Sequence, residues 1–167
     1  QDIHDSGDTE TFDALYTNMN GPNWTPRFRL LEVGCGTGVV LPELQRLFPA
    51  GRVIGMDLFA EGLKFARQRF PGTLIQGDVF QYAFEQPFDL IGALDVIEHL
   101  DDDEKILRRF WQQIRPGGHL IVTVPAHQSL WSYFDEVAHP RRRYPPAGLK
   151  RKLAAAGFTN VYVTQFM

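Results

Sequence analysis

Short apolar runs alternate with longer amphipathic stretches along most of this chain, and this alternation constrains the fold more than any other feature. The apolar runs are typical of buried strands and cover residues 29–33, 52–57, 73–76, 88–94, 119–124 and 159–166. Apolar residues recur at helical spacing over residues 37–48, 60–70, 101–114 and 145–156. Strands that alternate with helices predict a doubly wound, three-layer α/β fold with a mostly parallel sheet. Ligands bind such a sheet at the carboxyl ends of its strands.

One domain accounts for most of the chain. We expect residues 1–27 to form a flexible lead with a short helix over 10–16, followed by a single domain over 28–167. No apolar run approaches the roughly 20 residues that span a bilayer. The single cysteine, Cys35, cannot form an internal disulfide, which fits a reducing compartment such as the cytoplasm.

The charges give no electrostatic basis for general nucleic-acid binding, because the net charge is -3. A local basic stretch over 139–152 nevertheless contains six Lys and Arg residues and no acidic residue. Two interpretations of this stretch remain open. It contacts an anionic substrate or a membrane surface, or it is a solvated face.

A glycine-rich turn follows the first apolar run. Gly34, Gly36 and Gly38 alternate with other residues, which lets the backbone approach a ligand where a Cβ atom would collide. A dinucleotide fingerprint that starts at Gly34 needs glycine at position 39, where this chain has Val39. Glu32, just before the turn, would repel a pyrophosphate and attract a cationic ligand. A nicotinamide-dependent oxidoreductase is therefore the less favoured alternative.

Carboxylates follow the next strands. Asp57 ends the second strand, where it either accepts hydrogen bonds from ribose hydroxyls or caps the next helix. Asp78 follows the third strand and either accepts a hydrogen bond from an adenine amine or closes a turn. Val79 and Phe80 would then lie against the adenine ring. Together these strand ends predict a pocket for a positively charged adenosine without phosphates, a description that fits S-adenosylmethionine.

The motifs resemble those of a known family. The run Leu31-Glu-Val-Gly-Cys-Gly-Thr-Gly38 resembles the first motif of class I S-adenosylmethionine-dependent methyltransferases. Asp57, Gly77-Asp78, Asp95-Val-Ile-Glu-His99 and Arg115-Pro-Gly-Gly118 are similar to the later motifs, in the same order. The resemblance covers residues 28–124 well and residues 125–166 more loosely.

The resemblance implies an enzyme that moves a methyl group from S-adenosylmethionine to a small-molecule or lipid-like acceptor and releases S-adenosylhomocysteine. It implies cofactor contacts in four groups, which are the methionine end (Glu32, Gly34, Cys35, Gly36, Thr37, Gly38), the ribose (Asp57, Leu58), the adenine (Asp78, Val79, Phe80) and the sulfonium (Leu94, Asp95, Val96). A non-catalytic module that binds the cofactor for regulation or scaffolding is the alternative from another class.

Two histidines are candidate catalytic bases. Methyl transfer from a sulfonium is an in-line displacement, so alignment is the main requirement, and a base is needed only for an acceptor that arrives protonated. His99 lies at the fourth strand end, where it either acts as the base or packs against the following acidic helix. His139 lies in an aromatic-rich segment after the fifth strand, where such folds place substrate-covering elements. His127 is a weaker candidate.

Two further expectations concern a metal ion and the sheet edge. If residues 95–99 form a helical turn, Asp95, Glu98 and His99 share a face, similar to the Glu-x-x-Glu-His cluster of metal-assisted O-methyltransferases. Asp95 is shorter than the glutamate of that cluster, and we predict no metal. Family members end with a sixth strand and an antiparallel seventh, and we expect the seventh to be missing and the edge beside the fifth strand to be incomplete.

Overall fold

The computed structural model describes residues 28–126 and 142–164. Ten elements occur in these residues, in chain order β1 (Arg29–Val33), α2 (Leu41–Leu47), β2 (Arg52–Asp57), α3 (Ala60–Arg69), β3 (Thr73–Gln76), β4 (Phe88–Leu94), the 3-10 helix η1 (Ile97–His99), α4 (Asp103–Gln113), β5 (Ile114–Thr123) and α6 (Pro146–Ala156). None of the helices in these residues is long and apolar enough to cross a membrane.

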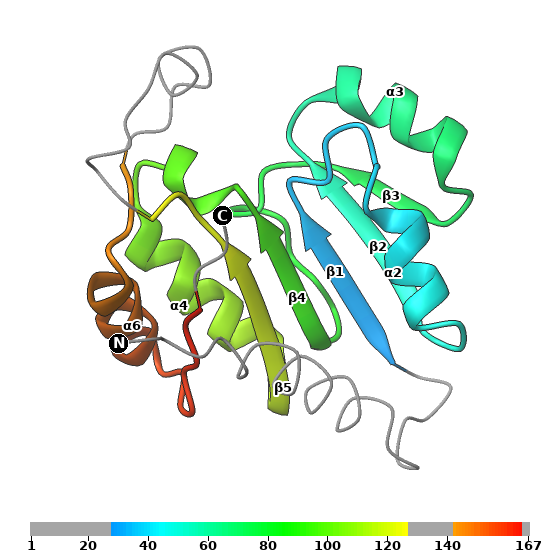
Figure 1. Cartoon of the computed structure of the whole chain (residues 1–167). Coiled ribbons are helices and arrows are strands. Elements are labelled where there is room, and N and C mark those ends of the chain that lie inside the picture. The colour runs from blue at the N-terminus through cyan, green and yellow to red at the C-terminus, as the bar shows by residue number, and fades with distance from the viewer. Residues whose placement is uncertain (1–27, 127–141, 165–167) are drawn as a thin grey trace, which may run out of the picture.

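The five strands form one parallel sheet in the order β3-β2-β1-β4-β5 (Figure 1). The chain steps outward from β1 through β2 to β3 and then returns to place β4 on the other side of β1. The strand order therefore reverses between β1 and β4. Ligands of open α/β sheets bind at the carboxyl ends of the strands beside such a reversal, which places the expected site after β1 and β4.

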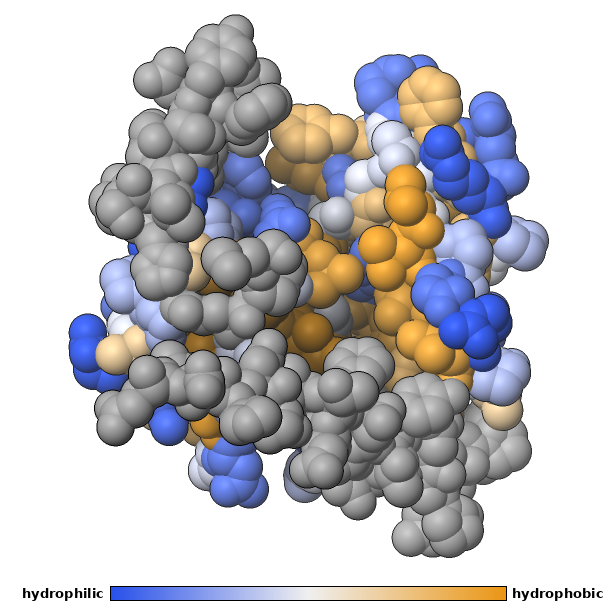
Figure 2. All heavy atoms as spheres, viewed as in Figure 1, coloured by the Kyte–Doolittle hydropathy of each residue, from blue (hydrophilic) through white to orange (hydrophobic). Residues whose placement is uncertain are grey.

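Helices cover both faces of the sheet. Neighbouring strand residues point to opposite faces, so Leu30 packs with α2 and α3 while Leu31 packs with α4 and α6. Val53 and Ile54 of β2 divide in the same way. Figure 2 shows hydrophobic side chains in the middle of one face of the molecule and hydrophilic ones along its edge beside α2 and α3. The predicted three-layer α/β fold is confirmed.

Three predicted elements differ from the structure by two or more residues at one end. The helix predicted over 37–48 begins only at Leu41, because the positive φ angles of the glycine turn continue to Gly38. The fifth strand begins at Ile114 instead of residue 119, with an irregularity opposite Asp89 that accommodates residues 115–118. The helix predicted over 101–114 is shorter at both ends, and the side chain of Asp102 caps its start.

The strand predicted over 159–166 is wrong for its described part. Residues 159–164 do not pair with the sheet, and residues 165 and 166 lie outside the described ranges. Apolar spacing indicates which side chains are buried but not whether a neighbouring strand is available to pair with the backbone. Phe158 and Val161 instead pack against the apolar cluster beside α4 and α6. Among the described strands, β5 pairs only with β4 and forms an edge of the sheet.

Candidate active site at the carboxyl edge of the sheet

The turn after β1 is held open by three glycines with positive φ. The φ angles are 71° at Gly34, 50° at Gly36 and 73° at Gly38. A Cβ atom at Gly34 would lie 2.5 Å from Val96, and one at Gly38 would lie 2.7 Å from Ala66. For a Cβ atom at Gly36, the described residues beyond its chain neighbours place no atom within 4 Å. Gly34 and Gly38 therefore allow close packing of this turn, whereas the described residues leave the space at Gly36 open.

Asp57 ties this turn to the end of β2. One carboxylate oxygen accepts a hydrogen bond from the backbone N–H of Gly36 at 2.7 Å, and the other accepts one from Phe59 at 2.8 Å. The helix cap considered as an alternative is not formed among the described residues, because the N-cap of α3 is Phe59 and no side chain bonds to its first turn. A carboxylate has about four acceptor sites, so Asp57 keeps two for a ligand. Leu58 is exposed beside it.

Asp78 closes a tight turn after β3. Its two carboxylate oxygens accept hydrogen bonds from the backbone N–H of Phe80 and from the side chain of Gln81, at 2.8 and 2.7 Å. Val79 and Phe80 are half-buried and pack against the apolar cluster beneath them. The structure therefore shows Asp78 closing a turn, which was one of its two predicted roles. Both carboxylate oxygens keep acceptor sites for a ligand.

The residues after β4 do not form the helical turn considered from the sequence. Asp95 has a φ of 52°, and its backbone N–H donates to the carbonyl and hydroxyl oxygens of Thr123 at the end of β5. The chain then enters the 3-10 helix η1, so the helical spacing assumed for a metal cluster is absent. Residues 28–126 and 142–164 contain no group of three or more His, Cys, Asp and Glu side chains arranged for a metal ion. Leu94 and Val96 flank Asp95, and Val96 contacts the glycine turn.

Two buried glutamates lie at this edge. Glu32 is 3% exposed and Glu98 is 2% exposed, and burial raises the pKa of each to about 7. The charge of Asp95 adds to the effect on Glu98, while the backbone N–H of Glu98 itself opposes it. Within the described part of the chain, the Oε2 atom of each lacks a hydrogen-bond partner. Such an oxygen can accept a hydrogen bond or pair with a cation, and water, an ion or a ligand can supply either.

The two candidate bases differ in what the structure shows. His99 ends η1, and its Nε2 atom lies 3.9 Å from Oε1 of Glu98. His139 and His127 lie outside the described residues. Cys35 is buried beneath the glycine turn, and burial raises the pKa of its thiol to about 12, which makes it a packing residue and a poor nucleophile.

A buried charge network beside η1 escaped the sequence analysis. Asp103 is buried at the start of α4 and contacts Arg142 at 3.1 Å, Lys152 at 3.0 Å and the hydroxyl of Tyr144 at 2.8 Å. The Tyr144 hydroxyl also lies 3.2 Å from the carbonyl oxygen of Ile97 in η1. Burial opposes ionisation of Asp103, but these partners outweigh it and lower the pKa of the carboxyl.

The Asp103 network includes two residues of the basic stretch over 139–152. Arg142 and Lys152 bind a buried carboxylate of their own chain, so neither interpretation made from the sequence describes these two residues. The only signal in the sequence was an acidic helix start far from a basic run. The 39 and 49 residues that separate the partners concealed the pairing.

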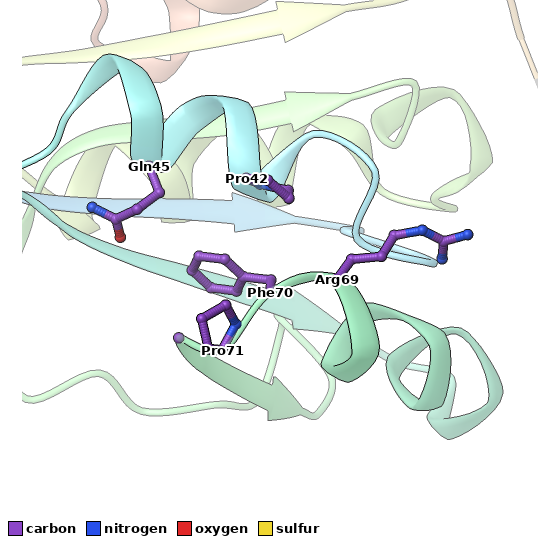
Figure 3. A pocket seen from close by; sticks show the side chains of 6 residues that line it. Pro42, Gln45, Arg69, Phe70 and Pro71 are labelled. Atoms are coloured by element: carbon purple, nitrogen blue, oxygen red, sulfur yellow. The ribbon is translucent and has the colours of Figure 1, made fainter.

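A shallow pocket of about 360 Å³ lies between α2 and α3, away from the predicted site (Figure 3). Its lining residues are Pro42, Gln45, Arg69, Phe70, Pro71 and Gly72. None of them is a predicted site residue. Arg69 connects this pocket to the glycine turn, because its guanidinium donates to the carbonyl oxygen of Thr37 at 2.9 Å.

Comparison with known proteins agrees with this geometry. A family model described as a methyltransferase domain matches residues 10–163, so the chain belongs to this methyltransferase family. The membership predicted from the motifs, in the class I S-adenosylmethionine-dependent methyltransferases, is confirmed. The helices and strands of the described residues thus form the fold that the family motifs imply.

The matches to individual relatives span only part of each relative's length. Trans-aconitate 2-methyltransferase from Azoarcus sp. (strain BH72) is 34% identical over 128 residues, which are 76% of this chain and 48% of that protein. Ubiquinone biosynthesis O-methyltransferase from Proteus mirabilis (strain HI4320) is 31% identical over 62% of this chain and 44% of that protein. The chain spans about half the length of these curated relatives.

A solved structure gives the same fold. Phosphoethanolamine N-methyltransferase 2 from Haemonchus contortus, in complex with S-adenosyl-L-methionine, superimposes with a TM-score of 0.69 and 25% sequence identity. The match covers 90% of this chain and 37% of that chain.

Proposed function

We propose that this chain binds S-adenosylmethionine and transfers its methyl group to a small-molecule or lipid-like acceptor. The observation that carries the proposal is the glycine turn, where Gly36 faces space that is open among the described residues. Four residues earlier in the chain, the buried Oε2 atom of Glu32 lacks a partner in the same part of the structure. The family match and the relatives named for methyl transfer support the same activity.

The residues at the strand ends suit this cofactor. The turn from Gly34 to Gly38 would hold the methionine end, and Glu32 would supply negative charge near its cationic groups. Asp57 retains acceptor sites for the ribose hydroxyls, and Asp78 retains acceptor sites for the adenine amine. The segment 94–96 would flank the sulfonium, since Val96 already contacts the glycine turn.

S-adenosylmethionine supplies a methyl group on a sulfonium that departs as a neutral thioether. The protein's task is then to align the acceptor with that methyl group, and positioning contributes up to about 7–11 kcal/mol in favourable cases. For an acceptor that arrives protonated, we propose His99 as the base and Glu98 as the carboxylate that stabilises its charged form, on the 3.9 Å separation of their side chains. His139 remains a second candidate base, proposed from the sequence alone.

The acceptor and its surroundings are also part of the proposal. The relatives are named for trans-aconitate and for ubiquinone biosynthesis, which supports a small-molecule acceptor without identifying one. A cytoplasmic location is supported by the buried free thiol of Cys35, which suits a reducing compartment.

Methyl transfer can be tested directly. The protein is incubated with S-adenosylmethionine and one acceptor at a time (trans-aconitate, a polyprenyl catechol, phosphoethanolamine), and S-adenosylhomocysteine formation is measured. We expect product with at least one acceptor and a large loss of it in His99→Ala. Tight cofactor binding without turnover of any acceptor would favour the non-catalytic module.

A further inference from the structure

The loop after β3 is bound to α4 mainly through Arg109. The guanidinium of Arg109 donates from Nε to the carbonyl oxygen of Val79 at 2.6 Å and from an Nη atom to the carbonyl oxygen of Tyr82. Arg109 is half-buried. One turn earlier on the same helix, the ammonium of Lys105 lies 5.5 Å from the centre of the Phe80 ring. Two cations of α4 thus hold the residues that follow Asp78.

This fastening matters because the loop has few bonds of its own. Residues 77–87 contain no helix or strand, and the turn at its start is closed by Asp78, whose carbonyl oxygen accepts from the N–H groups of Gln81 and Tyr82. The side chain of Asp78 is also used within the turn. The start of the turn is held by the N–H of Gly77, which donates to the carbonyl oxygen of Asp57, and by the packing of Val79 and Phe80 on the apolar cluster. The two hydrogen bonds from Arg109 add a direct link between the backbone of the turn and α4.

We propose that Arg109 is a positioning residue for adenine recognition: its guanidinium fixes the Asp78–Tyr82 turn so that the turn can read the exocyclic amine of the base. This inference rests on the proposed binding of S-adenosylmethionine. Arg109 acts through the turn and does not itself touch the base. An acceptor held in place accepts a hydrogen bond from the amine and is left unpaired against a carbonyl oxygen, which is also an acceptor. An acceptor that can move turns away from that oxygen, so the discrimination is smaller.

The test compares two ligands that differ at that amine. S-adenosylhomocysteine and S-inosylhomocysteine, which carries a carbonyl oxygen in its place, are titrated by calorimetry into wild type, Arg109→Gln, Arg109→Lys and Arg108→Gln. Arg108 is the exposed neighbour on the same helix and serves as the matched control. Thermal unfolding of each variant confirms that it is folded.

We expect wild type to bind the adenosyl ligand much more tightly than the inosyl ligand. In Arg109→Gln the adenosyl affinity should fall about ten-fold while the inosyl affinity changes little, as for the loss of one charge-assisted hydrogen bond. Arg109→Lys, which can reach one carbonyl group but not both, should give an intermediate ratio even if Arg109→Gln does not fold. Arg108→Gln should match wild type.

Equal weakening of both ligands in the Arg109 variants, or no change in either, would overturn the inference and leave the proposed function intact. Failure of wild type to bind S-adenosylhomocysteine would instead overturn the proposed function, and the inference with it.

Discussion

Within residues 28–126 and 142–164, Glu32 and Glu98 are the two buried carboxylates whose protonation changes near neutral pH. Both have a pKa of about 7 in the free protein, because burial disfavours the charged form. They belong to different elements, however, because Glu32 lies in β1 and Glu98 in η1. Glu32 precedes the glycine turn and is proposed to face the cationic end of the cofactor, whereas Glu98 lies in η1 beside His99.

Glu32 should make cofactor binding depend on pH. Below pH 7 the free carboxyl is protonated, so a cationic ligand must bind with loss of that proton, and affinity should fall by up to about ten-fold for each pH unit below 7. Calorimetric titration with S-adenosylhomocysteine between pH 5.5 and 8 measures this slope. Glu32→Gln should abolish it, and Glu98→Gln, which removes the other carboxyl of similar pKa, should retain it. A slope that survives in Glu32→Gln would contradict the assignment.

Asp57 should also contribute to the affinity for S-adenosylhomocysteine, through hydrogen bonds to the ribose. Asp57→Ala removes the acceptor sites left for the ribose and also frees the N–H of Gly36 that now binds the carboxylate. We expect S-adenosylhomocysteine to bind more weakly by about 1.5–3 kcal/mol, which is on the order of 10–150-fold. An unchanged titration for this variant would remove Asp57 from the ribose site.

Alanine substitutions in the glycine turn distinguish a glycine needed for packing, Gly38, from one proposed to be needed for ligand binding, Gly36. Alanine at Gly38 would meet the backbone and side chain of Ala66 in α3 at a positive φ, so it should cost several kcal/mol, about 3 or more, in the free energy of unfolding. Alanine at Gly36 meets no atom of the other described residues and should cost only about 1–2 kcal/mol for its φ of 50°.

The two variants should therefore lose different properties, Gly36→Ala mainly ligand affinity and Gly38→Ala mainly stability. Gly36→Ala should fold, as measured by urea denaturation, but bind S-adenosylhomocysteine poorly because its methyl group occupies ligand space. Gly38→Ala should lose stability first. If Gly36→Ala bound the ligand as wild type does, the open space at this turn would not be the cofactor site.

Patterns within one element were readable from the sequence, and contacts between distant elements were not. The first four strands and α6 follow from apolar spacing, and Gly157 ends α6 with a φ of 113° as its position indicates. The late start of α2 was missed because helical spacing records apolar side chains, while the positive φ at Gly38 is a backbone property. The unpaired segment after α6 was missed because a strand depends on a neighbour that its own residues do not specify.

Across the whole molecule, the site depends on a network that joins four segments. Asp103 of α4 binds Lys152 of α6 and Arg142 and Tyr144 of the segment before it, and Tyr144 reaches η1. None of these contacts was predictable, because each joins residues that are 39 or more positions apart in sequence. Geometry that positions His99 and Glu98 is thus supported by residues far from them in the chain.

Asp103 should accordingly matter for stability. Asp103→Ala leaves Arg142 and Lys152 without their shared carboxylate, and we expect a loss of about 3 kcal/mol in the free energy of unfolding. Because the folded pKa of Asp103 is lowered, its contribution is present above the unfolded pKa and is lost as pH falls through the folded value. Urea denaturation at pH 7 measures the loss, with Lys152→Gln as a milder variant that leaves the Arg142 and Tyr144 contacts in place. Equal stability of Asp103→Ala and wild type would show that the network contributes nothing.

Calorimetric titration of the purified protein with S-adenosylhomocysteine, with NAD as the parallel control, shows whether the carboxyl edge of this sheet binds S-adenosylmethionine. We expect micromolar binding of S-adenosylhomocysteine and no binding of NAD, because Val39 and Glu32 disfavour a pyrophosphate. No binding of S-adenosylhomocysteine, or binding of NAD in its place, would contradict the proposed cofactor site.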